Sequence, residues 1–125
     1  MRLLLDTHVL LWWLADDPSL GEEARAGISD PGSSVFVSAA TVWEISIKQQ
    51  LGKLEVPSDL LRQIDLNRFE PLSMTVSHAY TAGALPRHHD DPFDRMLVAQ
   101  AMKEGLVLLT GDPRMSRYGV DTLAS

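Results

Sequence analysis

The chain has 125 residues, a length that fits one domain spanning residues 1–125. Apolar residues make up 45% and charged residues 22% of the chain, a balance that argues against intrinsic disorder. The absence of cysteine excludes disulfide scaffolds, thiol nucleophiles and cysteine-ligated metal sites. The net charge of −6 argues against broad nonspecific binding to nucleic acid, but it leaves room for a basic rim around an acidic site.

The N-terminal segment lacks the long apolar run of a signal peptide. The longest apolar run, from Val9 to Ala15, is too short to span a bilayer. We therefore expect a cytoplasmic protein.

Short apolar runs that end at polar turns predict strands, and longer amphipathic segments predict helices. In chain order we expect a strand over 3–5, a helix over 9–14, a surface helix over 21–28, a strand over 35–37, a helix from Ser38 or Thr41 to about Leu51, a helix over 57–67, a weak strand over 69–72, a helix over 76–85, a helix over 93–104, a strand over 106–109 and an edge strand after Tyr118. Strands alternate with helices throughout. This order predicts an α/β fold, a three-layer sandwich around a mostly parallel sheet of four or five strands.

Helix caps add detail to this pattern. Thr7 is expected to cap the first helix, and either Pro57 in the first turn or Ser58 as the cap opens the helix over 57–67. Asp91 followed by Pro92 is a preferred opening for the helix over 93–104, because Asp suits the N-cap and Pro suits the first helical position.

Two carboxylates follow predicted strands. Asp6 comes directly after the first strand, and Asp112 follows the strand over 106–109. Because the carboxyl ends of parallel strands meet at one edge of a sheet, both side chains are expected at the same rim. The alternative interpretation is that each Asp only caps the helix after it.

Glu44 lies in a helix whose predicted buried stripe is Ala40, Trp43, Ile47 and Leu51. This stripe places Glu44 on the flank of the buried face, where an unpaired charge is rare. The helix begins after the strand over 35–37, so Glu44 is expected near Asp6. A salt bridge to Lys48, one turn further on, is the structural alternative.

Asp91 and Asp94 must be distinguished. Asp91 is explained as a helix cap, whereas Asp94 projects from the first turn beside the buried residues Phe93 and Leu97. An acidic residue in this turn also suits the helix dipole, so capping could explain both. We nevertheless take Asp94 as the site residue.

Four converging carboxylates would destabilise the fold. Two carboxylates ~5 Å apart repel by about 3 kcal/mol at an effective dielectric near 20, so the pairs among four would sum to roughly 20 kcal/mol. Typical domain stabilities are only about 5–15 kcal/mol. Such a cluster must hold protons or bind cations, and oxygen ligands without cysteine favour Mg²⁺ or Mn²⁺. A metal of this kind suits phosphodiester hydrolysis.

Several segments, in this order, resemble the PIN-domain ribonucleases, and more narrowly the VapC-type toxins of bacterial toxin–antitoxin pairs. The segments are Leu3-Leu4-Leu5-Asp6-Thr7-His8, Trp43-Glu44-Ile45, His89-Asp90-Asp91-Pro92-Phe93-Asp94-Arg95, Ala99-Gln100-Ala101 and Leu109-Thr110-Gly111-Asp112. The resemblance implies a PIN fold, a Mg²⁺- or Mn²⁺-dependent endoribonuclease, and inhibition by a cognate VapB-like antitoxin. The family's acidic residues correspond to Asp6, Glu44, Asp94 and Asp112, and its hydroxyl position, which orients the last carboxylate or its water, corresponds to Thr110.

RNA binding at an acidic site needs cations. The candidates near the acidic motifs in sequence are Lys48, Arg87, Arg95 and Arg114, with His88 and His89 as further phosphate contacts. For each of these residues taken alone, a solvated surface charge is the commoner role, and Arg95 could instead pair with an acidic neighbour.

The adjacent Trp12 and Trp13 point about 100° apart on one helix, so they cannot both face one buried layer. Either one lies at an interface with an antitoxin or a second subunit, or the two are split between core layers. Together with the resemblance, the first possibility predicts a homodimer that binds an antitoxin.

Three other functions were weighed against the toxin. A stand-alone PIN nuclease would share the site but lack the antitoxin. A phosphoryl-transfer protein also places an Asp after its first strand, but a haloacid-dehalogenase-type phosphatase needs Asp-x-Asp where this chain has Asp6-Thr7-His8. A non-catalytic interaction domain would leave the position of Glu44 unexplained.

Overall fold

The computed structural model describes all 125 residues. Five strands, all paired in parallel, form one sheet in the order β3-β2-β1-β4-β5. The strands are β1 (Arg2–Leu5), β2 (Ser34–Ser38), β3 (Glu70–Leu72), β4 (Val107–Thr110) and β5 (Thr122–Ala124). The predicted α/β class and parallel sheet are confirmed, and the chain after Tyr118 does supply the edge strand.

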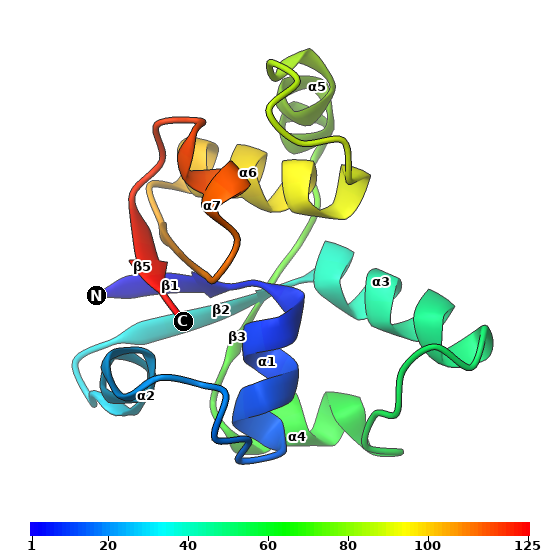
Figure 1. Cartoon of the computed structure of the whole chain (residues 1–125), viewed down its shortest axis with the longest axis vertical. Helices are drawn as coiled ribbons and strands as arrows, with labels where there is room; N and C mark the ends of the chain where they lie inside the picture. The colour runs from blue at the N-terminus through cyan, green and yellow to red at the C-terminus, as the bar shows by residue number, and fades with distance from the viewer.

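Seven helices surround the sheet, and Figure 1 shows α1, α2 and α4 on one side and α5, α6 and α7 on the other. Their bounds are α1 (Thr7–Leu14), α2 (Glu22–Ser29), α3 (Ala39–Gln50), α4 (Leu60–Leu66), α5 (Val76–Ala84), α6 (Pro92–Glu104) and α7 (Pro113–Ser116). This is the predicted three-layer arrangement. None of the helices combines the length and the apolarity needed to cross a membrane.

The central strand β1 divides the core into two clusters. Leu3 and Leu5 pack with residues of α1 and α2 on one face, whereas Leu4 packs with Leu97 and Val98 of α6 on the other. Side chains alternate along a strand, so a strand covered on both faces is apolar at every position. Each of these fully buried side chains contributes about 1.5–3 kcal/mol through burial.

Two predicted helix starts are wrong. Asp6, not Thr7, is the N-cap of α1, because its Oδ1 accepts from the backbone N–H of Val9 at 2.9 Å. The fourth helix begins at Leu60 rather than at Pro57, with Asp59 in the N-cap position. Ser58 and Asp59 are exposed, and Leu60 is the first residue of the helix to pack against the core.

The predicted buried stripe of α3 is correct only at Ala40. Trp43 is 56% and Leu51 is 62% exposed, whereas Thr41, Glu44 and Ile45 are buried. This face of α3 is the one enclosed by α1 and α6, with which α3 makes its contacts. The exposed ring of Trp43 meets the ring of Phe93 in α6 in a T-shaped arrangement, with centroids 5.3 Å apart.

The carboxyl ends of three neighbouring strands converge on one edge of the sheet. β1 leads into α1 through Asp6, β2 leads into α3 through Ser38, and β4 leads into α7 through Asp112. The N-terminus of α6 lies beside α3 (Figure 1). This edge is therefore where side chains from four helix starts can meet.

Candidate metal centre

Asp6 and Asp112 both act as helix caps, as the alternative interpretation held. The backbone N–H of Asp6 also donates to the carbonyl of Leu109 at 3.1 Å, which ties the end of β1 to β4. Asp112 caps α7 by accepting from the backbone N–H of Arg114 at 2.9 Å. Their role as caps is compatible with a shared site, because both residues line one cavity of about 280 Å³.

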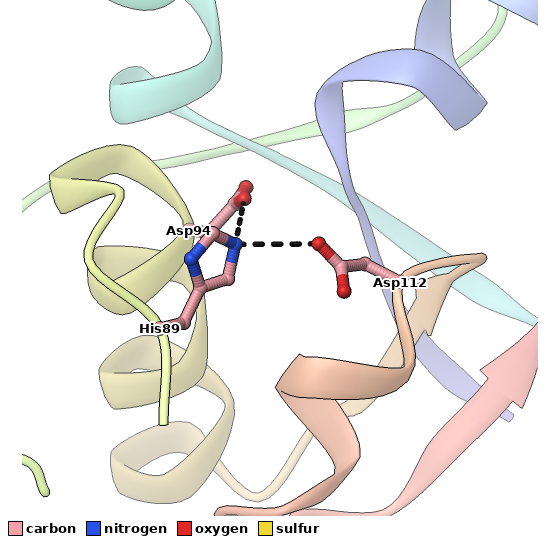
Figure 2. A group of neighbouring side chains, drawn as sticks. All are labelled: His89, Asp94 and Asp112. Atoms are coloured by element: carbon pink, nitrogen blue, oxygen red, sulfur yellow. Dashed lines mark hydrogen bonds and ion pairs between the residues drawn. The ribbon is translucent and has the colours of Figure 1, made fainter. Parts of the chain in front are cut away.

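A histidine joins two of the predicted carboxylates. Nε2 of His89 lies 2.8 Å from Oδ2 of Asp94 and 3.3 Å from Oδ2 of Asp112 (Figure 2). These ligand-type atoms all lie within 4.8 Å of one another. Asp94 comes from the first turn of α6, and Asp112 follows β4, so the histidine bridges two elements distant in sequence.

From the sequence, His89 is expected only to contact phosphate. In the structure its side chain is buried, and a peripheral role in binding phosphate does not describe it. The signal that could have found it is its place two residues before the Asp91 cap, in the turn that enters α6 beside Asp94.

The orientation of the His89 ring follows from its neighbours. Nδ1 accepts from the backbone N–H of Asp91 at 3.3 Å. With Nδ1 as an acceptor, the proton of the neutral ring sits on Nε2, which then donates to Asp94. The backbone of His89 is fixed as well, because its N–H donates to the hydroxyl of Tyr118 at 2.9 Å.

Arg95 holds the loop that carries His89. Its guanidinium donates to the carbonyls of Ala82, Leu85, Pro86 and His89 at 2.8–3.2 Å. The predicted role of Arg95 as an RNA contact therefore gives way to a structural one, because these carbonyls occupy the donors that a phosphate would need.

Glu44 is only 5% exposed and has two partners. The hydroxyl of Thr7 donates to Oε1, and Nζ of Lys48 lies 2.6 Å from Oε2. The salt bridge weighed as an alternative is thus present. Thr7, expected to be a cap, instead fixes the carboxylate of Glu44.

The electrostatics link three of the four predicted carboxylates, because Glu44 and Asp6 both raise the pKa of Asp94. Burial, then repulsion from Asp91, raises the pKa of Asp94 to about 6, with further increases from Glu44 and Asp6 and an opposing effect of His89. Burial also raises the pKa of Asp6, although hydrogen bonds from Thr110 and from the backbone N–H of Val9 offset part of this increase.

Asp112 behaves in the opposite way. Hydrogen bonds from Arg114 hold the pKa of Asp112 at about 2. Thr110, buried at the end of β4, shapes the same turn because its Oγ1 accepts from the backbone N–H of Asp112 at 3.1 Å.

The other predicted basic residues differ in whether they pair with a carboxylate of the site. Lys48 and Arg114 pair with Glu44 and Asp112, so they lie at the site but are engaged there. Arg87 is exposed on the loop before α6, beside a surface pocket that also includes Asp90 and Arg95. The ring of His88 rests against the ring of Tyr118.

A family model described as "PIN domain" matches residues 3–121 of this chain. The chain belongs to the PIN-domain family. It is 32% identical over 119 residues to ribonuclease VapC22 of Mycobacterium tuberculosis (strain ATCC 25618 / H37Rv), an alignment that covers 93% of this chain and 91% of that protein. The resemblance to VapC-type PIN proteins is therefore confirmed.

Solved structures agree with this PIN-domain assignment at the level of the fold. The structure of VapBC2 from Rickettsia felis, bound to a DNA fragment from their promoter, matches with a TM-score of 0.74 at 14% identity, covering 100% of this chain and 99% of that one. DNA-bound VapBC from Salmonella typhimurium matches with a TM-score of 0.73 at 21% identity, covering 99% and 98% of the two chains.

The site fits a hard divalent cation. Carboxylate oxygens are donors that suit both Mg²⁺ and Mn²⁺, whereas Nε2 of His89 carries a proton and contacts Asp94. The raised pKa of Asp94 reports burial together with repulsion among the carboxylates. A bound cation would relieve this repulsion.

Proposed function

We propose that this protein is a single PIN nuclease domain over residues 1–125, an endoribonuclease that depends on Mg²⁺ or Mn²⁺ and serves as the cytoplasmic toxin of a VapBC-type pair. The family and the relationship to VapC22 support a ribonuclease. The observation that carries the metal-dependent chemistry is the meeting of His89, Asp94 and Asp112 in a field that also includes Asp6 and Glu44.

The cation would be held by Asp6, Asp94 and Asp112, with Glu44 as the fourth carboxylate. Such an ion supplies an activated water and stabilises the charge that develops on phosphate oxygens. Asp94, whose pKa is about 6, is mostly ionised at neutral pH, and Asp112, whose pKa is about 2, is ionised throughout the neutral range.

The chain's own residues prepare this arrangement. Nε2 of His89 lies between Asp94 and Asp112 and donates its proton to Asp94. Thr7 and Lys48 keep the buried Glu44 in one orientation, and Thr110 shapes the turn that presents Asp112. Pre-organisation of this kind spares the protein the cost of ordering these groups when substrate binds.

Lys48, Arg87 and Arg114 are the cations available for substrate phosphates at this rim. Each has a partly or fully exposed side chain, and Lys48 and Arg114 could turn toward phosphate when a metal neutralises their carboxylate partners. The expected substrate is single-stranded or looped RNA, because its bases can be splayed and recognised there.

A protein partner is favoured by the exposed apolar side chains of α3, α4 and α5. Val76 is 88% and Tyr80 is 82% exposed, and Trp43 and Leu61 are more than half exposed. These side chains lie on separate faces, because α4 and α5 are on opposite sides of the sheet (Figure 1), so they offer separate contact surfaces. We assign these surfaces to a homodimer and a VapB-like antitoxin, whose basic side chain would enter the acidic pocket and offset the repulsion as a metal does.

The proposal is tested with purified, antitoxin-free protein and total RNA in Mn²⁺, in Mg²⁺ and in EDTA. Cleavage with metal and none in EDTA is the expected result. Folded protein that leaves RNA intact with both metals contradicts the nuclease. A stand-alone PIN nuclease is the second candidate, and it would be favoured by a strict monomer in light scattering, no short reading frame beside the gene and no toxicity on expression.

A further inference from the structure

A second feature lies beside the metal centre, on the first turns of α1. The rings of His8 and Trp12, one helical turn apart, have centroids 6.0 Å apart with planes tilted by 37°. Both residues line the cavity of about 280 Å³ that also contains Asp6 and Asp112 in its wall. His8 is exposed, and Trp12 is only partly buried.

We propose that this cavity, lined by Asp6, His8, Val9, Trp12, Gly111, Asp112 and Ser125 and hereafter called the α1 pocket, binds the nucleobase next to the scissile phosphate. The inference rests on the proposed ribonuclease function. Because the pocket shares Asp6 and Asp112 with the metal centre, a nucleotide whose phosphate lies at the centre has its neighbouring base within reach of Trp12.

The chemistry of the wall favours a base over a phosphate. The two carboxylates repel phosphate, and the only ionisable group of opposite sign in the wall is His8. A nucleobase is uncharged, it can donate N–H groups to carboxylates, and its flat face stacks on an indole. The cavity volume is near the lower end for ligand pockets, which suits a base rather than a larger group.

Trp13 supplies a matched control, although it is adjacent in sequence. Its Nε1 donates to Asn67 at 2.9 Å, and its ring packs on Phe69, away from the α1 pocket. The two tryptophans therefore have different roles. Trp13 ties α1 to the segment after α4, whereas Trp12 faces the pocket.

The test compares Trp12→Ala, Trp12→Phe and Trp13→Ala with wild type on a short single-stranded RNA that wild type cleaves at a mapped bond. Loss of one base-stacking contact predicts a KM about 5- to 100-fold higher for Trp12→Ala with little change in kcat. Trp12→Phe should recover most of the loss. Trp13→Ala should lower the melting temperature without changing KM at a temperature where it is folded.

A second substrate lacks the base at the nucleotide beside the cleaved bond. It shows whether the effect of Trp12→Ala comes from contact with that base. Wild type and Trp12→Ala should have the same KM on it, because the base that Trp12 would contact is gone. An unchanged KM for Trp12→Ala on the normal RNA overturns the proposal, and that result would be expected if the α1 pocket served a protein partner. The same holds if the Trp12→Ala effect persists in full on abasic RNA.

Measurements of RNA binding distinguish an error in this inference from an error in the proposed function. Fluorescence anisotropy with the labelled normal and abasic RNAs is measured in EDTA for the same variants. If wild type cleaves no RNA but binds it in a manner that depends on Trp12, the base pocket stands and the nuclease fails. If wild type neither cleaves RNA with Mn²⁺ nor binds either RNA, both fail.

Discussion

Nε2 of His89 lies 2.8 Å from Oδ2 of Asp94, five residues further along the chain. The contact spans the turn that enters α6, and the same nitrogen reaches Asp112 after β4 (Figure 2). The imidazole therefore lies between two carboxylates, and it donates its single Nε2 proton to Asp94. This contact fixes the side chain of Asp94 at the site.

We expect Asp94→Asn to stabilise the metal-free protein at neutral pH. The pKa of Asp94 is raised from 3.8 to about 6, so the folded state binds this proton more tightly than the unfolded state. The ionised side chain therefore costs stability above pH 6, and this cost disappears as pH falls toward 4. Melting curves in EDTA between pH 4 and 8 should show the variant above wild type at pH 8 and the difference shrinking with acidification.

Asp112→Asn is the matched comparison, and it should lower the stability of the metal-free protein at neutral pH. The pKa of Asp112 is lowered to about 2, so its charge contributes stability above pH 4 that is lost as pH falls toward 2. The pair with Arg114 is largely exposed, so the loss should be small. Equal shifts for the two variants would contradict this account of the site's electrostatics.

Asp91→Asn should leave both stability and cleavage nearly unchanged. Oδ1 of Asp91 accepts from the backbone N–H groups of Phe93 and Asp94, and Asn caps a helix almost as well as Asp. Asp91→Ala should cost about 1 kcal/mol in the free energy of unfolding, measured by urea denaturation. A dead Asp91→Asn enzyme would show that Asp91 is more than a cap.

His89→Ala should weaken Mn²⁺ binding about 10-fold, as expected when a group that orients ligands is removed. Without Nε2, Asp94 and Asp112 lose their common partner. His89→Gln places an amide N–H near the same position and should recover part of the affinity. Titration calorimetry with Mn²⁺ measures both variants, and His88→Ala, which changes the neighbouring ring on Tyr118, is the control. Unchanged Mn²⁺ affinity in His89→Ala would refute the positioning role.

Arg95→Lys should loosen the loop before α6 although it keeps the charge. The guanidinium contacts four backbone carbonyls at once, a geometry that an ammonium group cannot reproduce. Amide hydrogen exchange over 85–91 should therefore be faster in Arg95→Lys. Arg87→Lys, at an exposed position of the same loop, should exchange like wild type. Equal exchange rates in the two variants would contradict the role of Arg95 in fixing this loop.

The sequence predicts the layers of this fold well because short, fully apolar strands and the Asp91–Pro92 cap are strong local signals. It fails where a helix is buried on a polar face. In α3 the residues Thr41 and Glu44 are buried and Trp43 is exposed, because the neighbouring helices determine which face is covered, and apolar periodicity cannot show this.

Part of the site is invisible in the sequence for a similar reason. Asp6 and Asp112 can be recognised in the sequence because each follows a predicted strand. The role of His89 depends on where the loop after α5 is fastened, and this is decided by Arg95 and Tyr118. Contacts between residues so far apart along the chain arise only in the folded structure.

The most direct test of the account is RNA cleavage by Asp94→Asn and Asp91→Asn, measured beside wild type with Mn²⁺ and with EDTA. The two residues lie in the same helix start, three positions apart, but only the carboxylate of Asp94 contacts the His89 ring. We predict that wild type and Asp91→Asn cleave RNA with Mn²⁺ and do not cleave it in EDTA. Folded Asp94→Asn should not cleave RNA under either condition. An active Asp94→Asn beside an inactive Asp91→Asn, or a folded wild type that cleaves equally in EDTA, would contradict the account.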